Sequence, residues 1–220
     1  LWTACYLNCT QAEKHALSEY VRTIDKKKTY YTVITLDKAF RHHAQTVAIN
    51  HDLDILVFAA GSCAKGERVR NVVLPLLKDA PKMVTTEKTR KVSFVGRLDT
   101  HPVREELKAL YGHKWDFLSN KENWAEIVQQ SVFSLCPRGV GHTSYRLAEV
   151  IHSESIPIYV WDDQLLLPWL HTIPWHEMAI IIHRSEIHDL EKRVDEFDVE
   201  KAMLLLRKYK SWFDIDKNVR

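Results

Sequence analysis

Residues 136–149 read CPRGVGHTSYRLAE, and this stretch lies between two apolar runs, VFSLC at 132–136 and IPIYVW at 156–161. Both runs have the length of a buried strand, and YRLAEVI after the glycines has helical spacing. Proline, arginine, glycine, threonine and serine between them indicate a tight strand-to-helix turn rather than a surface linker. Turns of this kind lie at the sheet edge where α/β proteins bind ligands.

The sequence around this junction alternates between strand-like and helix-like segments. Strands are predicted at KVSFVG (91–96), WDFLS (115–119), VFSLC, IPIYVW and AIIIH (179–183). Helices are predicted at 103–112, 122–130 and 144–153, and two closing helices at 186–197 and 199–213. The repeated β-α-β order implies a parallel, doubly wound sheet, because crossover helices connect parallel strands.

The first part of the chain shows the same alternation with longer intervals. A helix is predicted at 11–24 and strands at 29–36 and 54–60, followed by a short apolar segment at 71–77. The polar stretch TTEKTRK (85–91) then indicates a domain boundary. We expect an α/β protein with two Rossmann-like domains, residues 1–88 and 89–220, facing each other across a cleft.

Composition and charge narrow the class of protein. The 220 residues include 31 lysines and arginines against 29 acidic residues, so nothing indicates nucleic-acid binding and an anion site has to be local. No apolar run approaches the roughly 20 residues of a membrane-spanning helix. We expect a globular chain, in the cytoplasm rather than the Golgi lumen. Because the chain begins with Leu1, we expect its natural N-terminus, with any anchor or signal, to lie upstream.

Two arginines follow the ends of predicted strands. Arg97 comes directly after KVSFVG, and Arg138 comes two residues after VFSLC. Since parallel strands open on one edge at their carboxyl ends, both guanidinium groups should converge there, beside a helix N-terminus. Two such groups suit a diphosphate, which offers paired oxygens for bidentate hydrogen bonds.

The residues between Arg138 and the helix fit the same anion site. Gly139 and Gly141 let the backbone approach a ligand closely. Thr143 or Ser144 can cap the helix or donate a hydrogen bond to a phosphate oxygen. The turn is therefore predicted to bind an anion.

Glu149 follows in the helix, opposite the apolar stripe of Leu147, Val150 and Ile151. We therefore expect its carboxylate to face out of the sheet. In one interpretation it accepts hydrogen bonds from ribose hydroxyls, as the acidic residue of dinucleotide sites does. In the other it pairs with Arg146, three residues earlier, on a solvated face. The spacing leaves both interpretations open.

An ordered set of residues resembles the signature of the exostosin family of glycosyltransferases. The matching residues are Pro137, Gly139, Ser144, Arg146, Glu149, Ile156, Pro157, Asp162 or Asp163, and Pro168. KVSFVGR and WHEMAIIIH resemble further segments of the family, so the likeness covers roughly residues 91–190. The sequence departs from the family pattern at two places: Ser153-Glu154-Ser155 replaces the usual Gly-Cys, and Trp169 replaces Phe. Both lie away from the predicted anion site, so they indicate a more distant relationship and not a loss of donor binding. In size the chain is similar to compact members, such as those we expect in viruses of algae.

The resemblance implies a GT-B fold and a nucleotide sugar held mainly by the C-terminal half. Together, the predicted anion site and the resemblance give the expected donor-binding residues: Arg97, Arg138, Gly139, Gly141, Thr143, Ser144, Arg146 and Glu149. It also implies transfer from a UDP-sugar to a hydroxyl of a glycan acceptor, with inversion at the anomeric carbon. Among the family's donor sugars we choose xylose. No cofactor and no metal are expected, because positive groups neutralise the leaving diphosphate.

Inversion requires one base, which we expect from the N-terminal half. Asp37 stands directly after the strand at 29–36 and is our choice, although it also fits as an N-cap for the segment that follows. His42 and His43 are the alternatives. Asp52-Leu53-Asp54 matches a metal-binding Asp-x-Asp, but it precedes a strand, so we interpret it as a turn.

Other polar and aromatic residues are assigned no role. Asp162 and Asp163 follow IPIYVW and can contact sugar hydroxyls, but a turn is the favoured interpretation. Trp161, Trp169 and Trp175 are expected in the core.

Two other classes of protein compete with the transferase. One is a non-catalytic nucleotide-sugar or glycan-binding module, or a degenerate transferase subunit. The other, an NAD-dependent oxidoreductase, is disfavoured because no G-x-G-x-x-G follows a strand. Turnover of a UDP-sugar in the presence of an acceptor separates the enzyme from the module.

Overall fold

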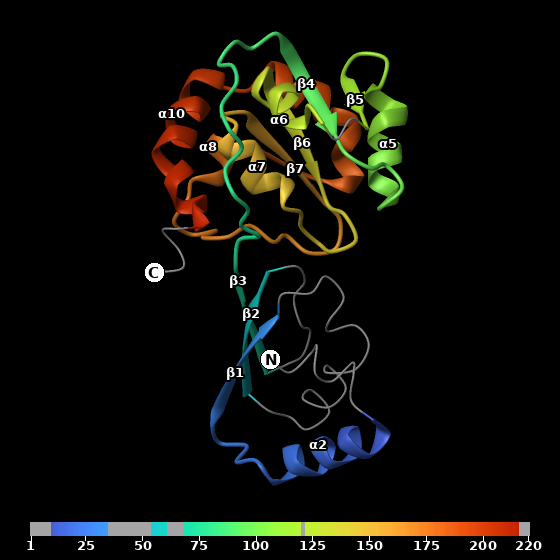
Figure 1. Cartoon of the computed structure of the whole chain (residues 1–220), viewed down its shortest axis with the longest axis vertical. Helices are drawn as coiled ribbons and strands as arrows, with labels where there is room; N and C mark the ends of the chain where they lie inside the picture. The colour runs from blue at the N-terminus through green and yellow to red at the C-terminus, as the bar shows by residue number, and fades with distance from the viewer. Residues whose placement is uncertain (1–9, 35–53, 61–67, 120–121, 216–220) are drawn as a thin grey trace. The chain divides into compact units, whose positions relative to one another are not determined.

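A computed structural model describes residues 10–34, 54–60, 68–119 and 122–215 of the chain. The chain divides into two compact units, Leu1–Leu74 and Pro75–Arg220 (Figure 1). The division lies before the boundary at 88/89 that the sequence suggested.

The segment after residue 74 belongs to the second unit because a buried glutamine holds it there. Gln129 Oε1 accepts hydrogen bonds from the main-chain N–H groups of Val84 at 2.7 Å and Thr85 at 3.2 Å, and its Nε2 donates to the carbonyl of Lys82 at 2.9 Å. Lys88 Nζ donates to the Gln129 carbonyl at 2.7 Å. The polar composition of this segment therefore indicates a strap without regular secondary structure, not a domain boundary.

The first unit contains a parallel three-stranded sheet. After helix α2 (Gln11–Thr23), the strands β1 (Thr29–Ile34), β2 (Asp54–Ala59) and β3 (Val69–Val73) pair in the order β1-β2-β3. Both pairings are parallel, and Ile34 lies opposite Ala59 in the register. The apolar, β-branched composition of β1 and β2 explains why they form strands.

The second unit is built on a five-stranded parallel sheet. Its strands are β4 (Arg90–Val95), β5 (Asp116–Leu118), β6 (Ser131–Pro137), β7 (Ile156–Trp161) and β8 (Ile180–His183). They are ordered β5-β4-β6-β7-β8, and every pairing is parallel. The predicted α/β class with parallel sheets is confirmed. The order reverses between β4 and β6, and in open α/β sheets ligands bind beside such a reversal.

Two groups of helices cover this sheet. The first group is α5 (Pro102–Tyr111), η1 (Arg184–Asp189) and α9 (Leu190–Asp195). The second is α6 (Trp124–Gln129), α7 (Arg146–His152), α8 (Trp175–Met178), α10 (Val199–Tyr209) and η2 (Lys210–Phe213). Within each group neighbouring helices pack together. Because crossovers are right-handed, the reversed strand order places α5 on the opposite face from α6 and α7.

The core of the second unit lies on both faces of the sheet. Apolar residues of β4, β6 and β7 are buried together with Leu147, Val150 and Ile151 of α7, which confirms the stripe expected for that helix. Trp175 is 2% exposed, and Trp161 and Trp169 pack against the core, so the core interpretation of the tryptophans is confirmed. Among the described residues, no helix has the length and apolar character needed to cross a membrane.

Glu154 shows how one departure from the exostosin pattern is accommodated. It has a φ of 52°, in the left-handed region that favours glycine, at the position where the family usually has Gly-Cys. Its carboxylate pairs with Arg207 and Lys210, each at 3.2 Å, and its carbonyl accepts from Lys88 at 2.7 Å. These contacts offset the unfavourable backbone conformation.

Candidate functional site

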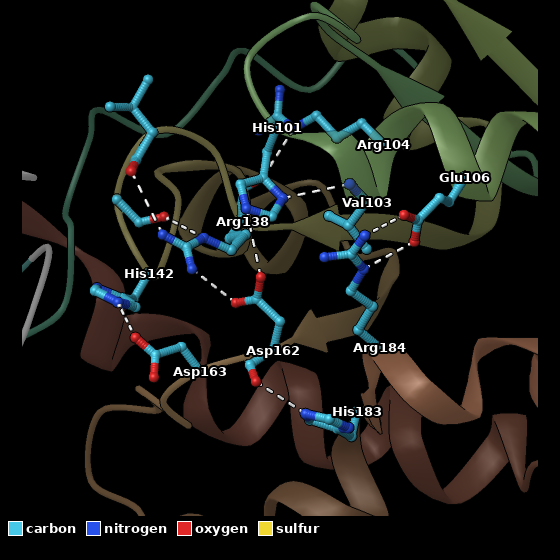
Figure 2. Close-up of polar contacts among 12 residues, drawn as sticks. His101, Val103, Arg104, Glu106, Arg138, His142, Asp162, Asp163, His183 and Arg184 are labelled. Atoms are coloured by element: carbon cyan, nitrogen blue, oxygen red, sulfur yellow. Dashed lines mark hydrogen bonds and ion pairs between the residues drawn. The ribbon is translucent and has the colours of Figure 1, made fainter.

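Polar side chains gather at the carboxyl edge of the second sheet, where the strands end (Figure 2). Arg138 follows β6, Asp162 and Asp163 follow β7, and His183 ends β8. His101, the N-cap of α5, joins them from the connection after β4. Because the strands run in one direction, residues far apart in the sequence meet at this edge.

Arg138 lies at the predicted edge, but its guanidinium points into the protein. Its side chain is 8% exposed, and Nη1 donates to Asp162 Oδ1 at 2.7 Å. Nε donates to the carbonyl of Gly141 at 3.0 Å and Nη2 to that of Val140 at 3.5 Å. Arg138 therefore reaches the edge that the sequence predicted but is occupied by partners within the protein, and its contact with a diphosphate stays a prediction.

Asp162 is at the centre of this polar cluster. His101 Nε2 lies 3.4 Å from Asp162 Oδ2, and His183 Nε2 lies 2.9 Å from the Asp162 carbonyl. Burial tends to raise the pKa of the Asp162 carboxyl, but the hydrogen bond and charge of Arg138 outweigh burial and the pKa lies below its ordinary value. Asp162 follows its strand in a bend, as expected, and in addition neutralises Arg138.

The surroundings of His101 favour its neutral form. Burial, and after it the positive charge of Arg138, lower the pKa of His101 below its ordinary value. Its Nδ1 accepts a hydrogen bond at 3.3 Å from the main-chain N–H of Val103, which caps α5. Nε2 then carries the proton and faces Asp162.

Arg97 is an exposed arginine of this edge. Its side chain is 66% exposed, and Nε and Nη2 donate to the two carboxylate oxygens of Asp99 at 3.0 and 2.6 Å. Exposed pairs of this kind contribute little to stability, so the guanidinium can exchange Asp99 for another anion.

Glu149 is buried, with 5% of its surface exposed. Arg146 Nη1 lies 3.0 Å from Glu149 Oε2, and Lys78 Nζ donates to Oε1 at 2.7 Å. Arg146 also donates to the carbonyl of Val95 at 2.9 Å and lies over the ring of Trp124. The expectation that Glu149 faces outward is wrong. It pairs with Arg146, as one interpretation had it, but in the interior instead of on a solvated face.

The loop between β6 and α7 is partly held by its own polar atoms. Ser144 Oγ accepts a hydrogen bond at 3.2 Å from the main-chain N–H of Arg146, the first residue of α7, while the N-cap position itself is Tyr145. Thr143 is buried. A Cβ atom on Gly139 would lie 3.2 Å from Arg104 Nη2, so the missing side chain leaves room for an arginine of the protein itself.

Several residues of this edge were absent from the sequence prediction, among them His101, Arg104 and Lys78. His101 and Arg104 belong to the start of α5, and Lys78 belongs to the strap before β4. In the sequence Arg104 and Lys78 look like ordinary exposed basic residues. Only for His101 was there a signal, because it precedes a proline at the first position of a helix.

A pocket of about 520 Å³ opens beside Asp162. Its lining residues are Glu106, Asp162, Asp163, His183, Arg184, Ser185, Ile187 and His188. Arg184 Nε donates to Glu106 Oε2 at 2.8 Å, and His142 Nε2 lies 2.9 Å from Asp163 Oδ2. Three carboxylates against one guanidinium give this lining a formal charge of −2 with neutral histidines.

Most of the candidate catalytic and metal-binding residues of the first unit cannot be compared with the structure. Asp37, His42, His43 and Asp52 lie outside the described residues. Asp54 begins β2, where it accepts hydrogen bonds from Thr29 Oγ1 at 2.6 Å and from Arg70 Nη2 at 3.2 Å. Within the part of the chain that the structure describes, no group of three or more His, Cys, Asp or Glu residues could hold a metal ion.

Comparison with known proteins identifies the family. The model of the exostosin GT47 domain matches residues 36–197. The chain therefore belongs to the exostosin GT47 family, and the resemblance noted in the sequence is confirmed.

Curated relatives match shorter stretches. "Probable glucuronosyltransferase GUT1" of Oryza sativa subsp. japonica is 32% identical over 87 residues, 40% of this chain and 20% of that protein. "Probable beta-1,4-xylosyltransferase IRX10" of Arabidopsis thaliana is 31% identical over 83 residues, 38% of this chain and 19% of that protein. The matched segment thus spans about a fifth of each relative. Among solved structures, TarM gives a TM-score of 0.49 with 11% identity, covering 93% of this chain and 50% of TarM.

Proposed function

We propose that this chain is an inverting glycosyltransferase that moves a sugar from a UDP-sugar to a hydroxyl of a glycan acceptor. The observation that carries the proposal is the exostosin GT47 match over residues 36–197. The names of the curated relatives, a glucuronosyltransferase and a xylosyltransferase, support glycosyl transfer. The predicted donor residues gather at one carboxyl edge, beside the reversal of strand order, which supports that edge as the donor site.

The proposed diphosphate contact is Arg97. Its guanidinium is exposed and pairs with Asp99 two residues away, so a diphosphate can replace that carboxylate. Arg138 contributes by holding the loop after β6 in place, and Arg146 adds positive charge beside Glu149. For Glu149 to accept a hydrogen bond from a ribose hydroxyl, Lys78 has to release Oε1.

The proposed reaction is a single displacement. The acceptor oxygen attacks the anomeric carbon from the side opposite UDP, and the bond from that carbon to the diphosphate breaks with its electron pair leaving on UDP. The hydroxyl proton goes to a base, for which we propose Asp37. General-base catalysis of this kind contributes about 10² to 10⁴ in rate. We propose that arginines neutralise the leaving diphosphate without a metal ion.

The pocket beside Asp162 bears on the choice of sugar. Its described lining has a formal charge of −2 and offers carboxylates, imidazoles and a hydroxyl as hydrogen-bond partners. If the sugar lies there, this charge disfavours glucuronic acid and favours a neutral sugar, for which we propose xylose.

Release of UDP from UDP-xylose, UDP-glucose, UDP-galactose, UDP-N-acetylglucosamine and UDP-glucuronic acid, with a glycan acceptor, tests this proposal. We expect turnover that survives EDTA and is faster with a neutral sugar than with glucuronic acid. Preference for UDP-glucuronic acid would overturn the neutral sugar, and activity lost in EDTA and restored by manganese would overturn metal independence. UDP binding without turnover would favour a non-catalytic nucleotide-sugar-binding module.

Two substitutions assign the roles. Arg97→Ala should weaken UDP binding by about 1.5–3 kcal/mol, since it removes a charge-assisted contact. Arg90→Ala, at the opposite end of β4, is the matched control and should bind UDP as the wild type does. Asp37→Asn should lower kcat with donor affinity unchanged. Wild-type kcat in that variant would move the base to His42 or His43.

A further inference from the structure

Arg104 is a buried arginine whose hydrogen bonds go to main-chain carbonyl groups. Nε donates to the carbonyl of Arg138 at 2.9 Å, Nη1 to that of Arg97 at 2.7 Å, and Nη2 to that of Pro137 at 3.4 Å. The residue lies in the first turn of α5 and is 9% exposed. Its guanidinium also lies over the ring of Phe94, 5.4 Å from the centroid.

These carbonyl groups mark the ends of two neighbouring strands. Pro137 ends β6, and Arg97 comes two residues after the end of β4. The strand order reverses between β4 and β6, so the chains leaving them diverge. One guanidinium spans this gap and fixes both chain ends at once. An ammonium group lacks the planar fork and cannot make the same three bonds.

The charge of Arg104 is not cancelled by an ion pair. Among the described residues, no carboxylate lies within ion-pair distance of its guanidinium. Burial, and after it the positive charge of Arg146, lower the pKa of Arg104 to about 10, which leaves it charged at neutral pH. A buried cation bonded only to neutral carbonyls adds positive potential at the edge where an anion is expected.

Gly139 is matched to this arrangement. A Cβ atom there would lie 3.2 Å from Arg104 Nη2 and 3.9 Å from Cζ. The first of these distances is close enough that the side chain would have to shift. Gly139 therefore provides the space for the guanidinium.

We propose that Arg104 is the positioning residue of the donor site, fixing the chain ends after β4 and β6 so that Arg97 and the loop 138–141 are pre-organised for a diphosphate. The inference rests on the proposed function. In this role Arg104 acts through the backbone and touches no reacting atom. Pre-organisation of binding groups lowers the cost of ordering them when the ligand binds.

The test compares Arg104→Lys and Arg104→Met with the wild type in the full chain. Arg104→Lys keeps the charge and loses the fork, while Arg104→Met loses both. Amide hydrogen exchange should become faster at residues 97–99 and 138–141 in both variants. UDP affinity, measured by calorimetric titration, should fall about tenfold or more. Arg90→Lys is the control, since Arg90 lies at the amino end of β4 and donates to Asp116.

Gly139→Ala provides an independent variant. Its added methyl group should displace the Arg104 guanidinium and reproduce a smaller loss of UDP affinity. Combined with Arg104→Met, it should add almost nothing, because the contact it disturbs is already gone. Additive losses would contradict a shared mechanism.

The outcomes separate this inference from the proposed function. Unchanged exchange at residues 97–99 and 138–141 would overturn it. Faster exchange with unchanged UDP affinity would also overturn it. Full retention of UDP affinity in Arg104→Lys would overturn it too, because it would show that the charge alone matters. If the wild type binds no UDP, the proposed function fails, whereas the exchange data still decide whether Arg104 holds the two chain ends.

Discussion

Arg138→Met should destabilise the second unit, in contrast to the effect expected for Arg97→Ala. Arg138 and Asp162 are 8% and 17% exposed, and Nη1 lies 2.7 Å from Oδ1. Removing one partner of a buried pair typically costs 3–5 kcal/mol because the other charge is left uncompensated. Asp162 retains His101 and some solvent, so we expect about 3 kcal/mol, or a Tm lower by roughly 6–12 °C.

Urea unfolding monitored by tryptophan fluorescence measures this loss. Six of the seven tryptophans lie in the second unit, and only Trp2 belongs to the first, so the fluorescence signal reports mainly on the second unit. A double-mutant cycle with Asp162→Asn isolates the pair: the two changes should be non-additive by about 1–3 kcal/mol. Arg97→Ala serves as the matched control and should leave the unfolding midpoint unchanged.

One result would refute this reasoning. If Arg138→Met keeps the wild-type midpoint but loses UDP affinity as Arg97→Ala does, then Arg138 binds the ligand directly and its internal contacts contribute nothing measurable. Equal loss of stability and of affinity would instead support a role in holding the loop.

Three further predictions concern other buried or partly buried groups. The pKa of His101 is lower in the folded protein than in the unfolded chain, so at acidic pH the unfolded chain binds more protons and the stability should fall as the pH drops below about 6.5. In His101→Asn, which keeps a capping side chain, urea midpoints between pH 7 and 5 should fall less than in the wild type. Glu149→Gln should lower the free energy of unfolding in urea by about 2–3 kcal/mol, because Arg146 loses its buried carboxylate partner. It should also weaken UDP binding in calorimetric titration. Unchanged stability would contradict the buried pair. Burial lowers the pKa of Lys88 to about 8, so between pH 8 and 10.5 the unfolded chain holds a proton that the folded chain has released. The stability of the wild type relative to Lys88→Met should therefore rise with pH in this range, and a difference that does not change with pH would count against the lowered pKa.

The sequence by itself determined the class of fold and much of the order of elements. Alternation of apolar strands with amphipathic helices is a local property, so it predicted the parallel strands β4 to β8 and the core stripe of α7. The sequence also located the turn after β6 and the exostosin pattern around it, because both depend on residue type and spacing. It did not separate η1 from α9, because the two helices follow each other in the chain without a gap, and it did not predict α8, which is four residues long.

Only the tertiary structure decided which way the long side chains of the site point. Spacing places Arg97 and Arg138 after strand ends, but the direction of a guanidinium depends on its partners. Arg138 turns inward because β7 brings Asp162 to it from 24 positions away, and Glu149 is buried because the strap brings Lys78 from 71 positions away. A buried charge is stable only beside such partners. Their meeting depends on the order of strands in the sheet, which no local stretch of the sequence contains.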